Sequence, residues 1–403
     1  MKSLYLLYIS PYSFFLWINR ATYLGVLASA LYFYDKYYGE YNILVPVSPK
    51  LAPVCIVGLV AYELGVWLGG IRLLNKRNQV GRPASRLIIP LIIWAIAIPC
   101  AIVLFYLQGV PLFTDPMRRA ELGPGLGLLK RALIVWLPMA SLEIYYIYTN
   151  KKKLSVPIIM IQIVTIAMLL LLTAKAGLFF YVVYLAIVYY HLRLCGKVAI
   201  VKMLLNTRMI MLGGVLVIVL YVYSSLALSE SFFETMTIRV TNLLAQAPNY
   251  ILEDLPGVPS RSEVLNNDLA SLMKTFRIPG NWDVRQLDSE LTTTILRREV
   301  LAGGLNPTVI GYGWLLGANA GVFVVSLLYG HISGSLVRML AHTNISTQFV
   351  IYIYALVAVH GGLEIFSPIG ALLDTGLSVM MYYAMYQIIK KSCPSKHLEI
   401  CPV

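Results

Sequence analysis

The sequence predicts an all-α fold: a polytopic membrane bundle of about ten transmembrane helices with one large helical loop outside the cytoplasm. Hydrophobic residues make up 59% of the 403 residues and charged residues only 13%, whereas charged residues are about a quarter of a soluble domain. Apolar runs long enough to cross a hydrocarbon core of about 30 Å recur along the chain. One polar stretch, residues 228–306, interrupts them. These observations exclude an ordinary soluble domain.

The apolar runs divide the chain into three parts. Residues 1–227 hold seven predicted spans, residues 228–306 form the polar loop, and residues 307–403 hold three further spans and a tail. Within the loop, prolines and glycines separate three stretches of helical character, 230–245, 266–276 and 287–302. The predicted spans are 15–34, 51–74, 87–107, 132–148, 156–172, 178–190, 209–227, 308–329, 349–360 and 371–389.

Positive charge is concentrated in alternate connections between the predicted spans. Because Lys and Arg accumulate on the cytoplasmic side of membrane proteins, these connections are predicted to be cytoplasmic. Both termini are then cytoplasmic, and residues 228–306, with seven basic and ten acidic side chains, lie on the opposite side. The basic residues of the cytoplasmic series are Lys76, Arg77, Arg82, Arg86, Lys151, Lys152, Lys153, Arg193, Lys197, Lys202, Arg208, Arg338, Lys390, Lys391 and Lys396.

Composition and motifs exclude several classes of function. The net charge of +13 follows from the cytoplasmic bias, so no nucleic-acid partner is predicted. None of the five cysteines lies in the polar loop, which argues against a disulfide framework and a cysteine metal site. The chain has no GxxxxGK[ST] motif for ATP and no HExxH motif for zinc. We therefore expect neither a metal nor a cofactor.

Five cations lie in short connections on the predicted outer side, where the cytoplasmic bias disfavours them. A bound diphosphate would compensate, because Arg makes paired, charge-assisted hydrogen bonds to phosphate and Lys supplies a mobile charge. For any one of them, pairing with outer acids or extension to lipid headgroups is the alternative. The five are Arg118, Arg119, Lys130, Arg131 and Lys175.

The polar loop adds further cations, and one span adds a candidate base. Arg239 is the preferred loop cation because its segment starts just above the membrane, and Arg297 and Arg298 precede the next span. His360 is predicted at the outer surface, where a histidine can take a proton from a hydroxyl group. A histidine bonded to a backbone group at a helix end is the alternative. The acids inside spans, which need a cavity or a partner in lipid, are Asp374 and Glu143.

Two short segments and the overall layout carry a resemblance. After the polar loop the chain reads Gly304-Leu305-Asn306-Pro307-Thr308-Val309-Ile310-Gly311 and then Gly317-Ala318-Asn319-Ala320-Gly321, and Gly109-Val110-Pro111-Leu112-Phe113 precedes Arg118 and Arg119. These segments resemble bacterial Wzy-type O-antigen (oligosaccharide repeat-unit) polymerases. The family often has Ser-Arg-Gly at a tight outer turn, where this chain has Ala174-Lys175-Ala176-Gly177. Lys175 keeps the charge there but loses the paired geometry.

The resemblance implies a GT-C-like glycosyltransferase of the bacterial inner membrane, with its large loop in the periplasm. Such an enzyme joins undecaprenyl-diphosphate-linked oligosaccharide repeat units without a metal, and the lipid diphosphate leaves. A chain-length-regulating co-polymerase and the lipid bilayer are the implied partners. The implied catalytic residues are His360 and Arg239, and the implied diphosphate-binding residues are Arg118, Arg119, Lys175, Arg297 and Arg298.

Two other functions stay open. An O-antigen ligase would use the same chemistry to move the glycan onto the lipid A core. A lipid-linked oligosaccharide flippase or other transporter belongs to a different class, and it would be expected to carry cations through the middle of its bundle. The sequence places few charges in the middle of its spans, which favours the polymerase.

Overall fold

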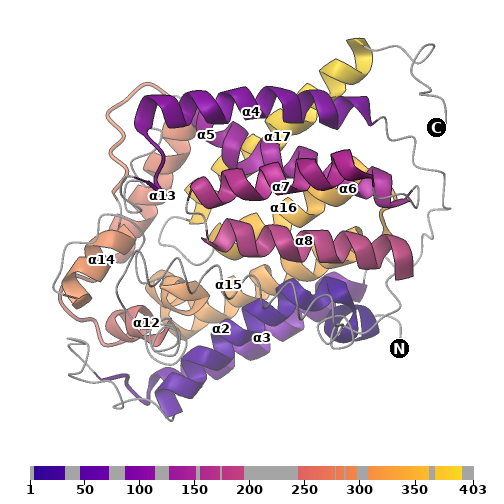
Figure 1. Ribbon diagram of the computed structural model, residues 1–403. Helices are drawn as coiled ribbons and strands as arrows, with labels where there is room; N and C mark the ends of the chain where they lie inside the picture. The colour runs from indigo at the N-terminus through magenta and orange to yellow at the C-terminus, as the bar shows by residue number, and fades with distance from the viewer. Residues whose placement is uncertain are drawn as a thin grey trace. The chain divides into compact units, whose positions relative to one another are not determined.

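The computed structural model describes residues 4–31, 46–71, 87–113, 127–150, 155–172, 175–194, 244–276, 278–285, 287–296, 307–362 and 368–392 (Figure 1). Every regular element in these ranges is a helix, which confirms the predicted all-α class. The chain forms two compact units. Unit 1 takes its helices from the described parts of 1–79, 194–342 and 355–374, and unit 2 from those of 80–193, 343–354 and 375–403.

The helices of the described ranges are those of a multi-pass membrane protein. Five are long and apolar enough to cross a bilayer, and three shorter apolar helices cover 156–171, 177–192 and 346–360. The predicted span at 209–227 lies outside the described residues, so the predicted total of ten stays a prediction. The five candidate spans are Pro11–Leu31, Leu51–Gly70, Ile88–Gln108, Gly127–Thr149 and Thr308–His342.

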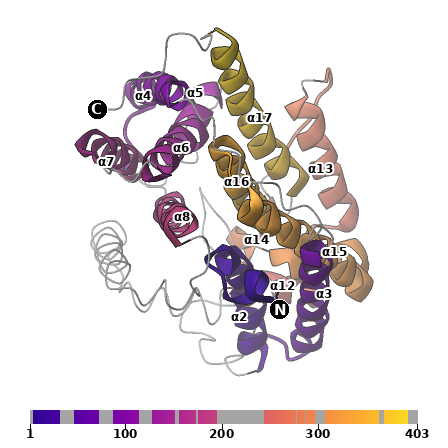
Figure 2. The ribbon, with the colours of Figure 1, turned by 90° about the vertical axis from the view of Figure 1, so that its right-hand side faces the viewer.

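Unit 1 is built on close packing between α3 (Leu51–Ile71) and α15 (Thr308–His342), which lie side by side in Figure 2. Each helix carries a Gly-x-x-x-Gly pair at the contact, Gly65 with Gly69 and Gly330 with Gly334. A Cβ atom on Gly330 would lie 2.1 Å from the carbonyl oxygen of Tyr62. Pairs of small residues at this spacing let membrane helices approach until their backbones touch. Apolar burial alone would not bring them together in lipid.

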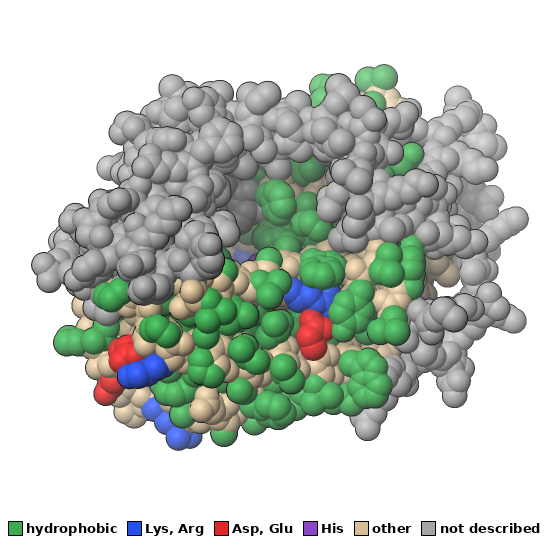
Figure 3. Space-filling model, turned by 90° about the horizontal axis from the view of Figure 1, so that it is seen from below, with side chains coloured by type: hydrophobic (Ala, Val, Ile, Leu, Met, Phe, Trp, Pro, Cys, Tyr) green, Lys and Arg blue, Asp and Glu red, His purple; other side chains and the backbone are tan. Residues whose placement is uncertain are grey.

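The opposite face of α3 is suited to lipid. Large apolar side chains at Ile56, Val60, Leu64 and Trp67 are each more than 40% exposed. Their spacing of three or four residues places them on one side of the helix, away from the glycines. Figure 3 shows one face of the molecule on which the described side chains are largely hydrophobic and the charged groups few.

The N-terminal segment packs on the same bundle. It comprises η1 (Tyr5–Ile9), η2 (Pro11–Ser13) and α2 (Phe14–Leu31). In α2 the buried guanidinium of Arg20 donates to Glu63 of α3 at 2.5 Å and to the carbonyl of Leu7 at 3.2 Å. Tyr8 donates to the second Glu63 oxygen at 2.6 Å, and its ring lies 4.3 Å from the guanidinium carbon. A charge buried in an apolar bundle is tolerated when it is paired in this way.

α15 is a helical hairpin, because its backbone leaves the helical region at Gly317 and Ala318. A Cβ atom on Gly313 would lie 2.7 Å from the Cα atom of Val322, whereas nine residues of straight helix would separate them by roughly 13 Å. Segment 308–316 therefore folds back against the helix that follows the turn and ends at His342. The predicted span 308–329 starts with the candidate span Thr308–His342, but the turn at Gly317 and Ala318 inside it was not predicted.

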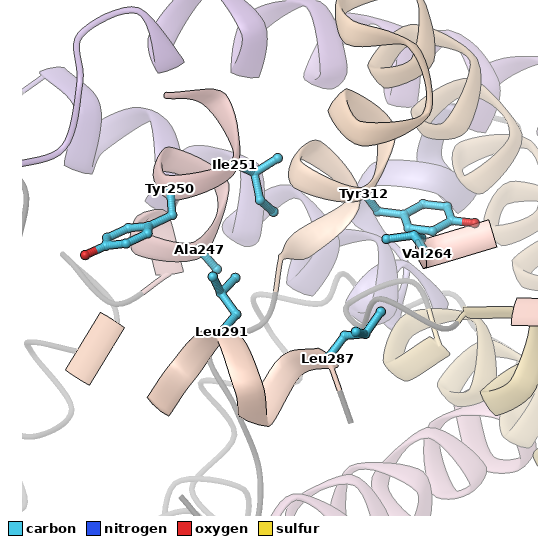
Figure 4. Close-up of a cluster of buried hydrophobic side chains, with 7 residues drawn as sticks. All are labelled: Ala247, Tyr250, Ile251, Val264, Leu287, Leu291 and Tyr312. Atoms are coloured by element: carbon cyan, nitrogen blue, oxygen red, sulfur yellow. The ribbon is translucent and has the colours of Figure 1, made fainter. Parts of the chain in front are cut away.

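The first arm of this hairpin belongs to a small cap made by α12 (Leu244–Leu252), α13 (Arg261–Thr275) and α14 (Leu287–Leu296). Tyr312 donates a hydrogen bond to Asp268 of α13 at 3.0 Å. Two of the three helices predicted in the polar loop overlap α13 and α14, and most of the third lies outside the described residues. The apolar core of the cap, drawn in Figure 4, consists of Ala247, Tyr250, Ile251, Val264, Leu287, Leu291 and Tyr312.

Polar contacts fix the entry to α13. Ser260 caps the helix, accepting from the backbone N–H of Glu263 while Glu263 accepts from the backbone N–H of Ser260. Arg285 donates to Glu263 at 2.9 Å and also pairs with Glu290. The N–H and hydroxyl of Ser260, with the Arg285 guanidinium, hold the pKa of the Glu263 carboxyl below its usual range. The capping box and the ion pairs thus act on one carboxylate.

Unit 2 contains α4 (Ile88–Gln108), α5 (Gly127–Arg131), η4 (Ala132–Trp136), α6 (Leu137–Asn150), α7 (Val156–Leu171) and α8 (Lys175–Leu194). α6 packs against both α4 and α7. α16 (Ser346–Gly362) and α17 (Pro368–Ser392) each contribute to both units.

Glu143 is a buried acid of unit 2, and its partners are hydroxyl groups. Its carboxylate accepts from Thr347 at 2.5 Å, from Ser346 at 2.8 Å and from Tyr382 at 2.7 Å. Ser346 and Thr347 open α16, where the positive end of the helix dipole favours a carboxylate. The partner that this acid was predicted to need therefore lies within the chain.

Candidate functional site

A buried polar network in unit 1 surrounds His360. Nδ1 of His360 lies 2.7 Å from Oδ1 of Asn19, and the same oxygen accepts from the hydroxyl of Tyr329 at 2.8 Å. The amide nitrogen of Asn19 donates to the hydroxyl of Tyr62 at 3.1 Å. Four helices, α2, α3, α15 and α16, each contribute one side chain to this network.

The network favours the tautomer of His360 that has its proton on Nδ1. An amide oxygen can only accept, so Nδ1 of His360 must donate to Asn19. The lone pair is then on Nε2, which is the nitrogen that can take a proton from a substrate. Asn19 therefore orients the imidazole, as the carboxylate bonded to Nδ1 does for the histidine of a Ser-His-Asp triad.

A small cavity adjoins this network. It is lined by Asn19, Thr22, Tyr23 and Tyr329 and by the hairpin segment 308–310, and its volume of about 10 Å³ has room for roughly one water molecule. Thr308, which is 2% exposed, has a φ of 57°. Positive φ in a β-branched residue is strained, and such strain is concentrated at functional sites.

A larger, open pocket lies at the turn of the hairpin. Its volume is about 320 Å³, within the range of ligand sites in proteins. Lys50 and Glu253, whose charged atoms are 3.6 Å apart, border it together with Trp314 and Asn319. The other lining residues are apolar: Pro53, Val54, Val57 and Leu252.

Local contacts hold this pocket in shape. The side chain of Asn249 in α12 accepts from the backbone N–H of Ser48 at 2.7 Å and donates to the carbonyl of Pro46 at 3.1 Å. These bonds fix residues 46–50, and so Lys50, against the cap. An aromatic face beside an amide, a carboxylate and an ammonium suits a sugar ring, which offers C–H groups on its faces and hydroxyls on its rim.

The structure describes few of the residues predicted for the site. Arg118, Arg119, Arg239, Arg297 and Arg298 lie outside the described residues. Lys175 is the first residue of α8 in unit 2. His360 lies in the last turn of α16, as predicted for the end of a span, and its side chain is buried, 9% exposed and bonded to Asn19 and Tyr329. Its predicted position on the outer side of the membrane stays a prediction.

Several site residues were missed from the sequence. Asn19 was missed although it is a polar residue inside an apolar run, which is the signal that could have found it. Asn319 belongs to the Gly-rich segment quoted above, yet no role was predicted for it. The hairpin turn and the cap bring together Lys50, Glu253 and Trp314, which lie far apart in the sequence. No local sequence pattern predicts this contact.

No group of three or more His, Cys, Asp or Glu side chains that could hold a metal occurs within the described ranges. Comparisons with protein-family models, with curated proteins and with solved structures find no match to this chain.

Proposed function

We propose that this membrane protein is a glycan polymerase that joins polyprenyl-diphosphate-linked oligosaccharide repeat units. The hydroxyl of one unit attacks the anomeric carbon of another, the bond from that carbon to the diphosphate breaks, and the electron pair leaves with the lipid diphosphate. The hydroxyl proton passes to a base. No metal is required if cations stabilise the leaving diphosphate.

One observation carries the proposal. The hairpin, which contains the segments that resemble the polymerase family, borders both the small cavity beside His360 and the open pocket at its turn. Thr308 and its neighbours line the small cavity beside the His360 network. Trp314 and Asn319 line the open pocket at the other end of the hairpin arm. In this proposal the open pocket binds a sugar of the acceptor. The hairpin arm runs from that pocket to the cavity beside His360, which is the base.

His360 is the proposed base. Its orientation by Asn19 leaves the lone pair on Nε2, and a general base can act through one intervening water. Asn19 and Tyr329, which contact His360, line the cavity of about 10 Å³, and this cavity has space for one water but not for a sugar. A contribution of about 10²–10⁴ in rate is expected of a general base.

The cations that stabilise the leaving group are the ones predicted from the sequence: Arg118, Arg119, Lys175, Arg239, Arg297 and Arg298. Removing one well-placed donor to a developing oxyanion costs roughly 3–4 kcal/mol, by analogy with acyl transfer. We therefore expect Arg118→Ala or Arg239→Ala to abolish long chains in a glycan ladder while protein levels hold.

The direct test is extension of lipid-linked repeat units by the purified protein. Wild-type protein should give a ladder of products. Trp314→Leu, which removes the aromatic wall of the pocket, should shorten the ladder strongly. Trp282→Leu is the matched control, because that indole lies in the cap and bonds to Ile278. Wild-type ladders from Arg118→Ala, Arg239→Ala and Trp314→Leu together would refute the proposal.

A transporter of lipid-linked oligosaccharides is the second candidate, because the interior of unit 1 does carry charges. Arg20 and its partner Glu63 lie within the bundle, where few charges were expected, and Arg20 is 3% exposed. Arg20 is fully engaged by Glu63 and Leu7, which favours a structural role. Proteoliposomes separate the two functions: a polymerase lengthens the glycan, and a transporter moves an unchanged lipid-linked unit across the bilayer.

A further inference from the structure

Arg338 of α15 is a buried cation that forms no ion pair with any residue that the structure describes. The residue is 4% exposed, and its Nε and Nη1 atoms meet no hydrogen-bond partner in the part of the chain that the structure describes. A guanidinium carries five N–H donors and is always charged. Leaving two of its nitrogens buried and unpaired is among the most costly arrangements a folded protein can have.

Arg20, a second buried arginine in unit 1, has partners for its guanidinium. Arg20 has the Glu63 carboxylate, the Leu7 carbonyl and the ring of Tyr8 around its guanidinium. No ion pair to Arg338 occurs within the described ranges. The difference points to a group that is not part of this protein.

The position of Arg338 indicates what that group is. It lies nineteen residues after Asn319, which is roughly 28 Å along the helix and close to the thickness of the hydrocarbon core. The turn of the hairpin and Arg338 therefore lie near opposite membrane surfaces. At that depth the abundant anion is the phosphate of a lipid headgroup.

The neighbouring residues on α15 are also suited to an anion. His331, Ser335, Arg338 and His342 are spaced by four, three and four residues, which places them on one face of the helix. Ser335 faces α3, since its Oγ would lie 3.0 Å from a Cβ atom on Gly69. His342 bonds through Nδ1 to the carbonyl of Arg338 at 2.8 Å. This face of α15 therefore places imidazole and hydroxyl groups beside the guanidinium of Arg338.

We propose that Arg338 binds a phosphate group at the end of unit 1 opposite the hairpin turn, and that a phospholipid headgroup supplies it. A guanidinium matches two phosphate oxygens with a pair of charge-assisted hydrogen bonds. The site is separate from the proposed glycan site and does not rest on the polymerase function.

The test compares melting temperatures in a neutral, phosphate-free detergent after additions that differ in one group. Dioleoylphosphatidylglycerol is compared with dioleoylglycerol, which has the same chains without the phosphate, and inorganic phosphate is added separately at constant ionic strength. Arg338→Met is the variant, because its side chain fills a similar volume without charge. Lys390→Met is the matched control, since this lysine is exposed at the end of α17.

Phosphatidylglycerol should raise the melting temperature of the wild type, and dioleoylglycerol should not. Arg338→Met should melt higher than the wild type in detergent alone, because the unpaired charge is gone, and should lose the response to the phospholipid. Lys390→Met should respond as the wild type does. An equal rise with inorganic phosphate would assign the site to free phosphate.

Two results would overturn the proposal. If phosphatidylglycerol and inorganic phosphate both leave the wild type unchanged, Arg338 binds no phosphate. If Arg338→Met is destabilised equally in every medium, the guanidinium has a partner within the chain. The first comparison uses the wild type alone, so it decides the matter even if the variant does not fold.

Discussion

Nδ1 of His360 lies 2.7 Å from Oδ1 of Asn19, although 341 residues separate them in the chain. Asn19 accepts from Tyr329 through the same oxygen and donates to Tyr62 through its nitrogen. The Asn19 amide therefore joins α2 to α3, α15 and α16, and it favours one tautomer of the proposed base, His360.

Asn19→Leu should reduce glycan extension about as strongly as His360→Ala, by roughly 10²-fold or more, because the imidazole loses the acceptor that orients it. Tyr62→Phe is the control: it removes a hydroxyl from the same amide but leaves the bond to His360 intact. Steady-state extension rates on purified variants of equal melting behaviour measure the difference. Equal losses in Asn19→Leu and Tyr62→Phe would mean that the network is only structural.

How far the sequence predicts this architecture depends on the kind of signal. Helix class and most membrane helices follow from long apolar runs, because lipid exposure imposes a simple rule on composition. The contact of α3 with α15 also has a signal in the sequence, because each helix carries a Gly-x-x-x-Gly pair, Gly65 with Gly69 and Gly330 with Gly334. The pair predicts close helix packing but does not identify the partner helix. The hairpin turn was not predicted, although the Gly-rich segment 317–321 interrupts the apolar run there, because glycines are also common inside membrane helices.

The site was less predictable than the fold. His360 was chosen for its chemistry, and its burial came from partners on three other helices that lie far away in sequence. Arg20 and Glu63 stand in consecutive apolar runs with opposite charges, a signal that was present and not used. The structure does not test the predicted diphosphate-binding cations, since most of them lie outside the described residues.

Gly330→Ala should destabilise the protein by about 1–3 kcal/mol, the usual cost of overpacking a tight contact. The added Cβ would lie 2.1 Å from the Tyr62 carbonyl oxygen, so α3 and α15 must separate. Gly376→Ala in α17 is the matched control, because its Cβ would meet no atom within 4 Å in the described chain. Gly376→Ala should be neutral or stabilising by roughly 0.5–1 kcal/mol. Equal melting temperatures for both variants would contradict the close packing.

Ala318→Gly should stabilise the hairpin turn by about 1 kcal/mol, because Ala318 has a φ of 49° and a ψ of −137°, a conformation that favours glycine. Ala320→Gly, two residues later in the exposed start of the long helix, should destabilise by roughly 0.5–1 kcal/mol instead. The two variants carry the same change in composition, so their melting temperatures isolate the backbone conformation. A loss of stability in both would indicate that α15 does not turn at this point.

The cap should lose stability in acid through Glu263. Its pKa is lowered in the folded protein by the Ser260 N–H and hydroxyl and by Arg285. A lowered pKa means that the unfolded chain binds the proton more readily. The contribution is therefore complete above the ordinary carboxyl pKa and disappears as the pH falls through the lower, folded value. Because the pair is exposed, the effect of the ion pair itself is small.

Hydrogen exchange of α13 measured through this acid range should show protection falling as the carboxylate is protonated. Glu263→Gln should flatten that dependence, because the amide keeps an acceptor for the Ser260 N–H but does not titrate there. Ser260→Ala should lower stability by about 0.5–2 kcal/mol at neutral pH, as loss of an N-cap does, while leaving Arg285 in contact with Glu263. An unchanged acid dependence in Glu263→Gln would assign the titration to another carboxyl group of the cap.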